Sequence, residues 1–132
     1  SAASDVYKRQ GHPGMGDSIA AAVRATRSAA GGWMVLPADL PLVQANTLVT
    51  IARAPLEGEV LVPIFAGQRG HPVRFAADCG DALVDLKGNQ GAAPVVSARA
   101  ASKLIVNDAG CVLDIDTVAD LERARATWRQ GP

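Results

Sequence analysis

Short hydrophobic runs alternate with stretches of helical periodicity along most of the chain. Apolar residues recur every three to four positions over residues 17–30, 45–54, 76–86 and 91–101, and a last helix is predicted to begin at Thr117. Between them, short apolar runs predict strands over residues 33–36, 59–65, 71–75, 103–108 and 111–116. This alternation predicts an α/β domain with a mixed, mostly parallel sheet and flanking helices, in which residues 59–75 form a hairpin.

An aspartate interrupts the apolar stretch "VLPADLPLV" at residues 35–43. The preceding run, Trp33 to Leu36, is short and bounded by glycine and proline, which predicts a fully buried central strand. Pro37 has no N–H to donate, so pairing is expected to end near it. Asp39 then lies just past the carboxyl end of a strand, where open α/β sheets bind ligands. It either holds a metal ion or forms a turn between prolines.

Two further segments carry residues suited to binding. In "GMGDS", residues 14–18, two glycines precede a helix, so that backbone N–H groups either face an anion or form an ordinary N-terminal turn. In "QRGHP", residues 68–72, Arg69 and His71 flank a glycine at a turn. They either contact a phosphate or a base, or belong to an ordinary polar hairpin loop.

A pair of carboxylates stands in "LDIDT", residues 113–117. On a strand, Asp114 and Asp116 would point to the same face, where their repulsion calls for a cation or hydrogen-bond donors. The alternative is a turn that starts the last helix and carries a spare acid. Mg²⁺ favours one or two carboxylates together with phosphate oxygens. Asp39 and this pair are therefore predicted to meet at one Mg²⁺ site.

Composition excludes several classes of protein. The 132 residues suffice for one domain, and nearly half are hydrophobic. A formal net charge of zero argues against nucleic acid or a membrane surface as the main partner. Two distant cysteines make no disulfide framework and indicate reduced thiols in a cytoplasmic protein. Residues 1–10 fit no period and are interpreted as a non-native tail, which leaves residues 11–132 as the domain.

The segments "GMGDSIAAAVRA", "VLPADLPLV", "RGHPVRF" and "VLDIDTVADL" occur in an order and spacing that resemble the molybdenum cofactor cytidylyltransferases, of the MobA-like nucleotidyltransferase group. The resemblance runs from about Gly11 to Trp128. It implies a Rossmann-like nucleotidyltransferase fold and a reaction that moves CMP from CTP to the phosphate of molybdopterin cofactor and releases pyrophosphate. A molybdoenzyme or its chaperone is a further implied partner.

The same resemblance assigns roles to individual residues. Asp39 matches the acid that binds Mg²⁺. Asp114 and Asp116 match the second acidic or amide pair near the metal and the triphosphate, with Asp116 as the second metal ligand. The acceptor-facing loop corresponds to Arg69 and His71. The segment that lines the nucleotide is matched by Gly14, Gly16 and Ser18.

The glycine-rich "LAAG…RMG…K" segment that opens these enzymes does not occur in the chain. We therefore expect a C-terminal part of such a domain that lacks the N-terminal strands, leaves the strand containing Val35 with an unpaired edge, and is inactive alone. The sequence also departs from the family at Asn89 and Ala93, where Asp and Arg are usual. Two alternatives stay open: a non-catalytic nucleotide-binding or scaffold module, and a related nucleotidyltransferase that uses another acceptor or GTP.

Overall fold

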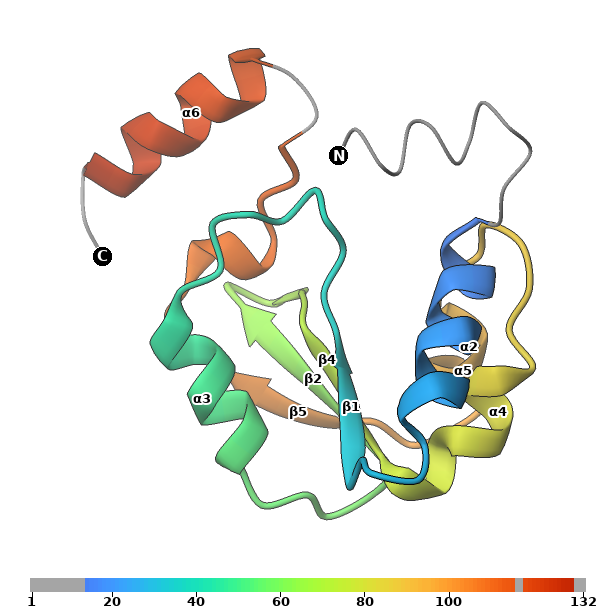
Figure 1. Ribbon diagram of the computed structural model, residues 1–132. Coiled ribbons are helices and arrows are strands. Elements are labelled where there is room, and N and C mark those ends of the chain that lie inside the picture. Colours follow the sequence, from blue (N-terminus) through green and yellow to red (C-terminus); the bar gives the residue numbers. More distant parts are fainter. Residues whose placement is uncertain (1–13, 116–117, 130–132) are drawn as a thin grey trace.

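A five-stranded sheet with helices on both faces organises the computed structural model, which describes residues 14–115 and 118–129 (Figure 1). The strands are β1 (Gly32–Val35), β2 (Val60–Phe65), β3 (Gln68–Arg69), β4 (Val73–Ala76) and β5 (Ser102–Ile105). The α-helices are α2 (Met15–Thr26), α3 (Ala45–Arg53), α4 (Gly80–Val84), α5 (Ala93–Ser97) and α6 (Val118–Arg129). Two 3₁₀ turns, η1 (Ala77–Cys79) and η2 (Ala109–Cys111), complete the set. No helix in the described ranges has both the length and the hydropathy to cross a bilayer.

The sheet is mixed because β4, the return strand of a hairpin that begins with β2, lies between β1 and β2 and runs against both. β4 pairs antiparallel with β1 on one side and with β2 on the other, and β3 pairs antiparallel with β2. β5 pairs with β2 in parallel. It follows that β1, β2 and β5 run in one direction and that β4 runs against them. The predicted α/β class, with a mixed sheet and flanking helices, is confirmed.

Two strand predictions were wrong. Within the described residues β1 pairs with β4 alone, and Met34 is 40% exposed, so β1 is a half-buried edge strand rather than a buried central one. Its free side agrees with the unpaired edge expected for the strand containing Val35. Residues 111–115 form no strand either, because η2 turns the chain and the Ile115 N–H donates to the Asp39 carbonyl, at 2.7 Å, instead of joining the ladder. Residues 1–10, Asp116 and Thr117 lie outside the described ranges.

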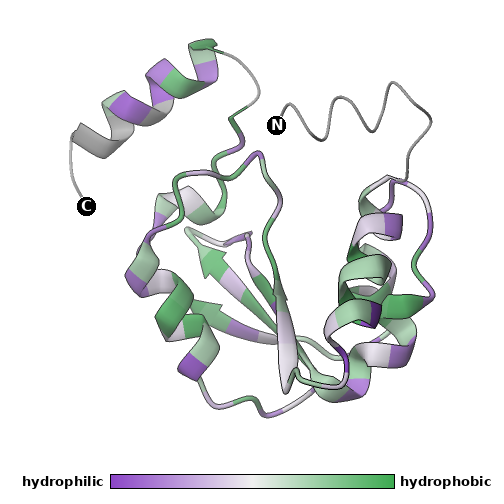
Figure 2. Cartoon of the chain, viewed as in Figure 1, coloured by the Kyte–Doolittle hydropathy of each residue, from purple (hydrophilic) through white to green (hydrophobic). Residues whose placement is uncertain are grey.

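The main core lies between the sheet and the helices α2, α4 and α5. Hydrophobic residues dominate the central strands (Figure 2). Side chains of β2 and β4 that alternate along each strand point to this face, as the two-residue period requires. Each fully buried Val, Leu or Phe side chain stabilises the fold by about 1.5–3 kcal/mol relative to exposure. The buried members are Ala20, Val23, Val60, Val62, Val73, Phe75, Cys79, Leu83, Leu86 and Val95.

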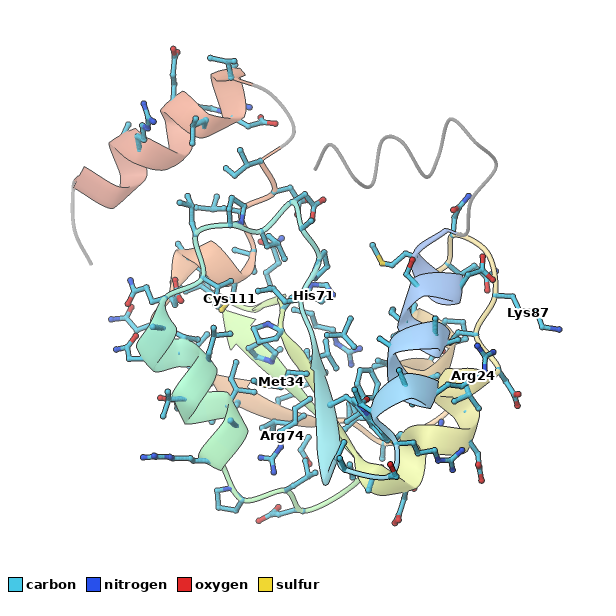
Figure 3. The ribbon with its side chains drawn as sticks, viewed as in Figure 1. Arg24, Met34, His71, Arg74, Lys87 and Cys111 are labelled. Atoms are coloured by element: carbon cyan, nitrogen blue, oxygen red, sulfur yellow. The ribbon has the colours of Figure 1, made fainter. Side chains whose placement is uncertain are left out.

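Helix α3 covers the opposite face of the sheet and is fixed there at its C-terminal end by an arginine of β4. At its C-terminus, Arg74 of β4 donates to the carbonyls of Ile51 and Ala54, at 3.0 and 2.6 Å. A cation is favourable at that end because it meets the negative end of the helix dipole. Figure 3 shows Arg74 and Met34 between β1 and α3. The fixed helix in turn anchors the loop that joins β1 to α3 and carries Asp39.

Candidate functional site

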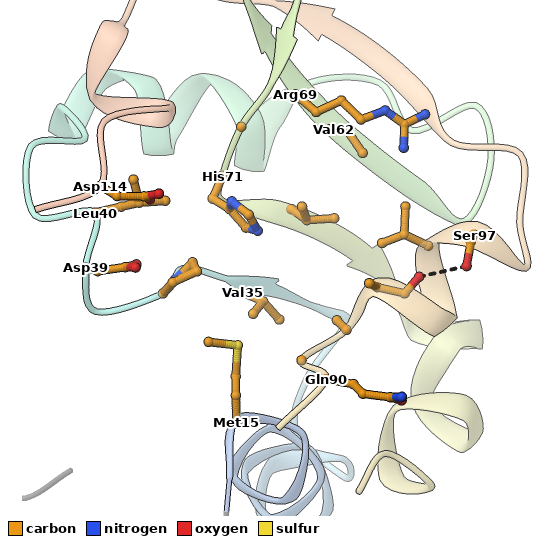
Figure 4. Close-up of a pocket in the computed structure, with 17 residues that line it drawn as sticks. Met15, Val35, Asp39, Leu40, Val62, Arg69, His71, Gln90, Ser97 and Asp114 are labelled. Carbon is orange, nitrogen blue, oxygen red and sulfur yellow. Dashed lines mark hydrogen bonds between the residues drawn. The ribbon is translucent and has the colours of Figure 1, made fainter. Parts of the chain in front are cut away.

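A pocket of about 490 Å³ opens at the carboxyl end of β1 (Figure 4). Its floor is apolar and comes from three strands and α5, whereas polar side chains stand around its rim. The floor includes Val35, Val62, Val73 and Val96, and the rim includes Asp39, Arg69, His71, Gln90, Ser97 and Asp114. Such a combination of apolar walls and few polar groups is typical of small-molecule sites.

The loop after β1 places Asp39 on the rim. β1 ends at Val35, close to Pro37, as predicted. The Leu40 N–H then donates to the Pro37 carbonyl at 3.2 Å, and the Leu40 side chain is buried, so the turn is anchored just beyond the aspartate. Asp39 itself is half-buried and lines the pocket. The turn geometry and the pocket position therefore coexist, although the sequence presented them as alternatives.

The segment after η2 brings Asp114 to the same rim. The backbone bond from Ile115 N–H to the Asp39 carbonyl ties the two acidic segments together. Asp114 is exposed, and Figure 4 shows its carboxylate and that of Asp39 on the same side of the pocket. Residues 39 and 114 thus line one rim, and their predicted sharing of one Mg²⁺ stays a prediction. Asp116 lies outside the described residues.

The segment between β3 and β4 supplies His71, which lies on the same rim as both carboxylates, and Figure 4 shows its ring directed into the pocket. Its backbone N–H donates to the Cys111 carbonyl at 2.9 Å, and Figure 3 shows the two residues together at one end of the sheet. Burial lowers the pKa of His71, and this effect exceeds the opposing influence of the Asp114 and Asp39 charges. The imidazole is therefore neutral at neutral pH, where one ring nitrogen donates and the other accepts. Arg69, in β3, is exposed at the rim.

The glycine segment at the start of α2 does not offer its amides to an anion. The Gly14 N–H donates to the Asp17 carboxylate at 3.1 Å, and the Gly16 N–H donates to the Gly88 carbonyl at 2.7 Å. A Cβ at residue 14 would lie 1.9 Å from Asn89 Oδ1, so the loop of residues 87–91 covers this helix end. The amides of Gly14 and Gly16 are therefore bonded within the protein, which favours the ordinary N-terminal turn of the two alternatives. That these residues line the nucleotide stays a prediction. Ser18 does not line the pocket either.

The loop covering α2 contributes pocket residues that the sequence analysis missed. Gln90 and Ala92 line the pocket. Gln90 lies between two glycines of left-handed backbone, Gly88 at φ +69° and Gly91 at φ +63°, and Ala92 directly follows the second. That pair of glycines in "KGNQG" marked a loop, but which cavity the loop borders depends on the packing of α2. Ser97 also reaches the pocket, yet its hydroxyl donates back to the Ala93 carbonyl of its own helix at 2.9 Å.

The donor set at the rim fits a divalent cation that is shared with a phosphate. Within the described ranges no group of three or more His, Cys, Asp or Glu side chains is arranged to hold a metal ion. Asp39 and Asp114 offer hard carboxylate oxygens, and Mg²⁺ and Mn²⁺ favour such ligands. Because Mg²⁺ commonly takes only one or two protein carboxylates and completes its shell with phosphate and water, the rim suits an ion that arrives with a nucleotide.

The comparisons with known proteins agree with this fold. The family model described as MobA-like NTP transferase domain matches residues 3–104. No curated protein matches the chain. Among solved structures, the homologue of Mycobacterium tuberculosis Rv0371c from Mycobacterium sp. strain JC1 is 23% identical with a TM-score of 0.70, over 86% of this chain and 58% of that one. At this identity the likeness concerns the fold.

Rv0371c from Mycobacterium tuberculosis H37Rv is 31% identical to this chain, with a TM-score of 0.62. A structure of Rv0371c in complex with manganese is also 31% identical, with a TM-score of 0.66. Each match covers 80% of this chain and 58% of the other. The chain therefore spans little more than half the length of these structures.

Proposed function

Because the chain belongs to the MobA-like NTP transferase domain family, we propose that it forms part of a nucleotidyltransferase that moves CMP from CTP to molybdopterin cofactor. The observation that carries this proposal is the rim of the pocket. Two carboxylates, Asp39 and Asp114, meet there at the carboxyl end of β1, beside His71. A non-catalytic binding module has no need of paired acids where anionic substrates bind.

The transfer requires positioning more than covalent help from the protein. An oxygen of the acceptor phosphate attacks the α-phosphorus of CTP, the bond from that phosphorus to the bridging oxygen of the β-phosphate breaks, and pyrophosphate leaves. A divalent cation, when bound, neutralises charge on the phosphates. Asp39 and Asp114 would hold that cation, and Asp116 is proposed as a further ligand. Without the cation, the negative charges of these carboxylates would repel the anionic phosphates of the substrate.

The segment from β3 to β4 is proposed to bind the acceptor. Arg69 lies at the rim as a cation that suits a phosphate, since its guanidinium can donate two parallel hydrogen bonds. His71 is neutral and can position a phosphate or a ring by hydrogen bonding without adding charge. The apolar floor formed by Val35, Val62 and Val73 suits the flat face of a heteroaromatic ring. The glycine-rich segment of the family is proposed to supply the triphosphate cradle, a role that the covered start of α2 does not support.

Manganese in the Rv0371c structure makes Mn²⁺ a suitable probe of the metal site. We expect this chain to bind Mn²⁺, measured by electron paramagnetic resonance of the free ion, and Asp39→Asn to weaken that affinity at least tenfold. The magnitude is a lower bound, because even residues that only support metal ligands are typically worth about 10–100-fold in affinity. Asp78→Asn, on the exposed surface of η1, is the matched control.

Activity is tested in a protein in which this chain follows a glycine-rich segment of the family. Formation of labelled product from CTP and molybdopterin cofactor should depend on Mg²⁺ or Mn²⁺ and should fall at least tenfold in Asp39→Asn, to the same lower bound. GTP in parallel reactions tests the choice of nucleotide, and reactions without acceptor test the choice of acceptor. An Asp39→Asn protein that transfers CMP at the parent rate would refute the proposed role of this carboxylate.

A further inference from the structure

A third acid, Asp108, is buried behind the pocket and does not line it. It is 2% exposed and lies between β5 and η2. One carboxylate oxygen accepts from the Gln44 N–H at 2.9 Å and from the Thr47 hydroxyl at 2.7 Å. The other accepts from the Gly110 N–H at 2.9 Å. Three donors from two separate segments thus converge on one buried side chain, which holds these segments together.

These partners belong to the two segments that carry the rim carboxylates. Gln44 and Thr47 stand at the start of α3, directly after the loop that carries Asp39. Gly110 stands in η2, directly before the segment that carries Asp114. Asp108 therefore joins the end of one acidic segment to the beginning of the other, across more than 60 positions of sequence.

The two segments also touch at two further points between Asp108 and the rim. Gly110 packs so closely on the Leu42 carbonyl that a Cβ there would lie 2.2 Å from its oxygen. Farther along, the Ile115 N–H donates to the Asp39 carbonyl at 2.7 Å. We name this contact, from Asp108 and Thr47 to Ile115 and Asp39, the acid joint. Its rim end joins the backbone of Asp39 to that of Ile115, the residue after Asp114.

We infer that Asp108 is a positioning residue, whose buried carboxylate closes the acid joint and thereby sets the spacing at which Asp39 and Asp114 share a divalent cation. This inference rests on the proposed function, since it concerns the same metal site. A shared cation tolerates little error in ligand spacing, because Mg²⁺ and Mn²⁺ favour near-octahedral coordination. Asp108 acts through its backbone and side-chain partners and contacts no substrate.

The test uses two variants that open the joint and one that does not. Asp108→Asn turns one of the two acceptor oxygens into an amide N–H₂, so that the side chain can no longer accept from Gln44 and from Gly110 at the same time. Thr47→Val removes one donor, keeps the shape of the side chain and leaves the charge of the protein unchanged. Val23→Ala, in the core under α2, lowers stability far from the joint and serves as the stability-matched control.

Two measurements are made on each folded variant, with circular dichroism confirming the fold at the temperature used. The first is Mn²⁺ affinity. The second is the hydrogen-exchange rate of the Ile115 amide, which reports opening at the rim end of the joint. We expect Asp108→Asn to weaken Mn²⁺ binding and to speed Ile115 exchange, each at least tenfold, with smaller changes of the same sign in Thr47→Val. Val23→Ala should leave Mn²⁺ affinity unchanged.

The outcomes separate this inference from the proposed function. Asp108→Asn that is folded and binds Mn²⁺ like the parent overturns the positioning role, whatever its Tm. Weakened Mn²⁺ binding with unchanged Ile115 exchange also overturns it, because the effect then bypasses the joint. If the parent itself binds no Mn²⁺, the proposed metal site fails, and faster Ile115 exchange alone decides whether Asp108 closes the joint.

Discussion

The close approach of Gly110 to Leu42 gives a quantitative prediction for Gly110→Ala. A Cβ at residue 110 would lie 2.2 Å from the Leu42 oxygen, 2.5 Å from the Leu42 carbonyl carbon and 2.9 Å from Asp108 Oδ1. Ordinary contact begins at 3.4 Å, so the two backbones would have to separate by about 1 Å. Backbone atoms cannot turn aside as the end of a flexible side chain can.

The expected cost follows from the effect of excess volume in packed regions. Inserting one methyl group into a well-packed site typically costs about 1–3 kcal/mol, and a clash with backbone belongs at the upper end, about 2–3 kcal/mol. For a domain of this size each kcal/mol lowers Tm by roughly 4 °C. We therefore expect Gly110→Ala to melt about 8–12 °C below the parent.

Calorimetry of the parent, Gly110→Ala and Gly31→Ala provides the assay. Gly31 is exposed, and a Cβ there would meet no atom within 4 Å, so this control isolates the general effect of exchanging glycine for alanine. That effect is neutral to stabilising by about 0.4–1 kcal/mol, through the unfolded chain. If Gly110→Ala melts at the temperature of Gly31→Ala, the tight contact between the two acidic segments is wrong.

Two further perturbations test other parts of the structure. Burial, reinforced by the Asp108 charge, raises the pKa of Cys111 from 9.0 to about 11, so the unfolded thiol loses its proton first and stability falls as the pH rises from 9 towards 11. In Cys111→Ala, the unfolding free energy measured in urea should fall less steeply between pH 9 and pH 11. Some fall should remain because the pKa of Cys79 is also raised. An unchanged dependence of stability on pH would contradict the raised pKa of Cys111. Asp17→Ala removes the acceptor of the Gly14 and Gly88 N–H groups, so it should lower the free energy of unfolding by about 1–2 kcal/mol and speed amide exchange at Gly88. Asp78→Ala is the control, and equal unfolding free energies for the two variants would refute the role of Asp17.

Local patterns in the sequence determined the class of fold and most of its elements. Hydrophobic runs bounded by glycine and proline located β1 and β2, and helical periodicity located α2 and α3, because these patterns depend only on which face of an element is buried. Pro94 is compatible with its helix because it lies in the first turn, where a missing N–H costs nothing. Asp39 was found for the same kind of reason: a charged residue in an apolar run after a strand is conspicuous without any knowledge of its neighbours.

Tertiary contacts decided the edge position of β1 and the arrangement of the site, because several residues form hydrogen bonds with partners remote in sequence. The edge position of β1 depends on which strands are beside it, which its own four residues do not encode. The Gly14 and Gly16 amides belong to a carboxylate and a loop rather than to an anion, and only the packing of residues 87–91 against α2 shows this. Asp108 read as the polar end of a strand, yet its burial and its three donors come from α3 and η2. The spacing of the rim carboxylates is therefore a property of the fold, since the contacts that set it join segments far apart in the chain.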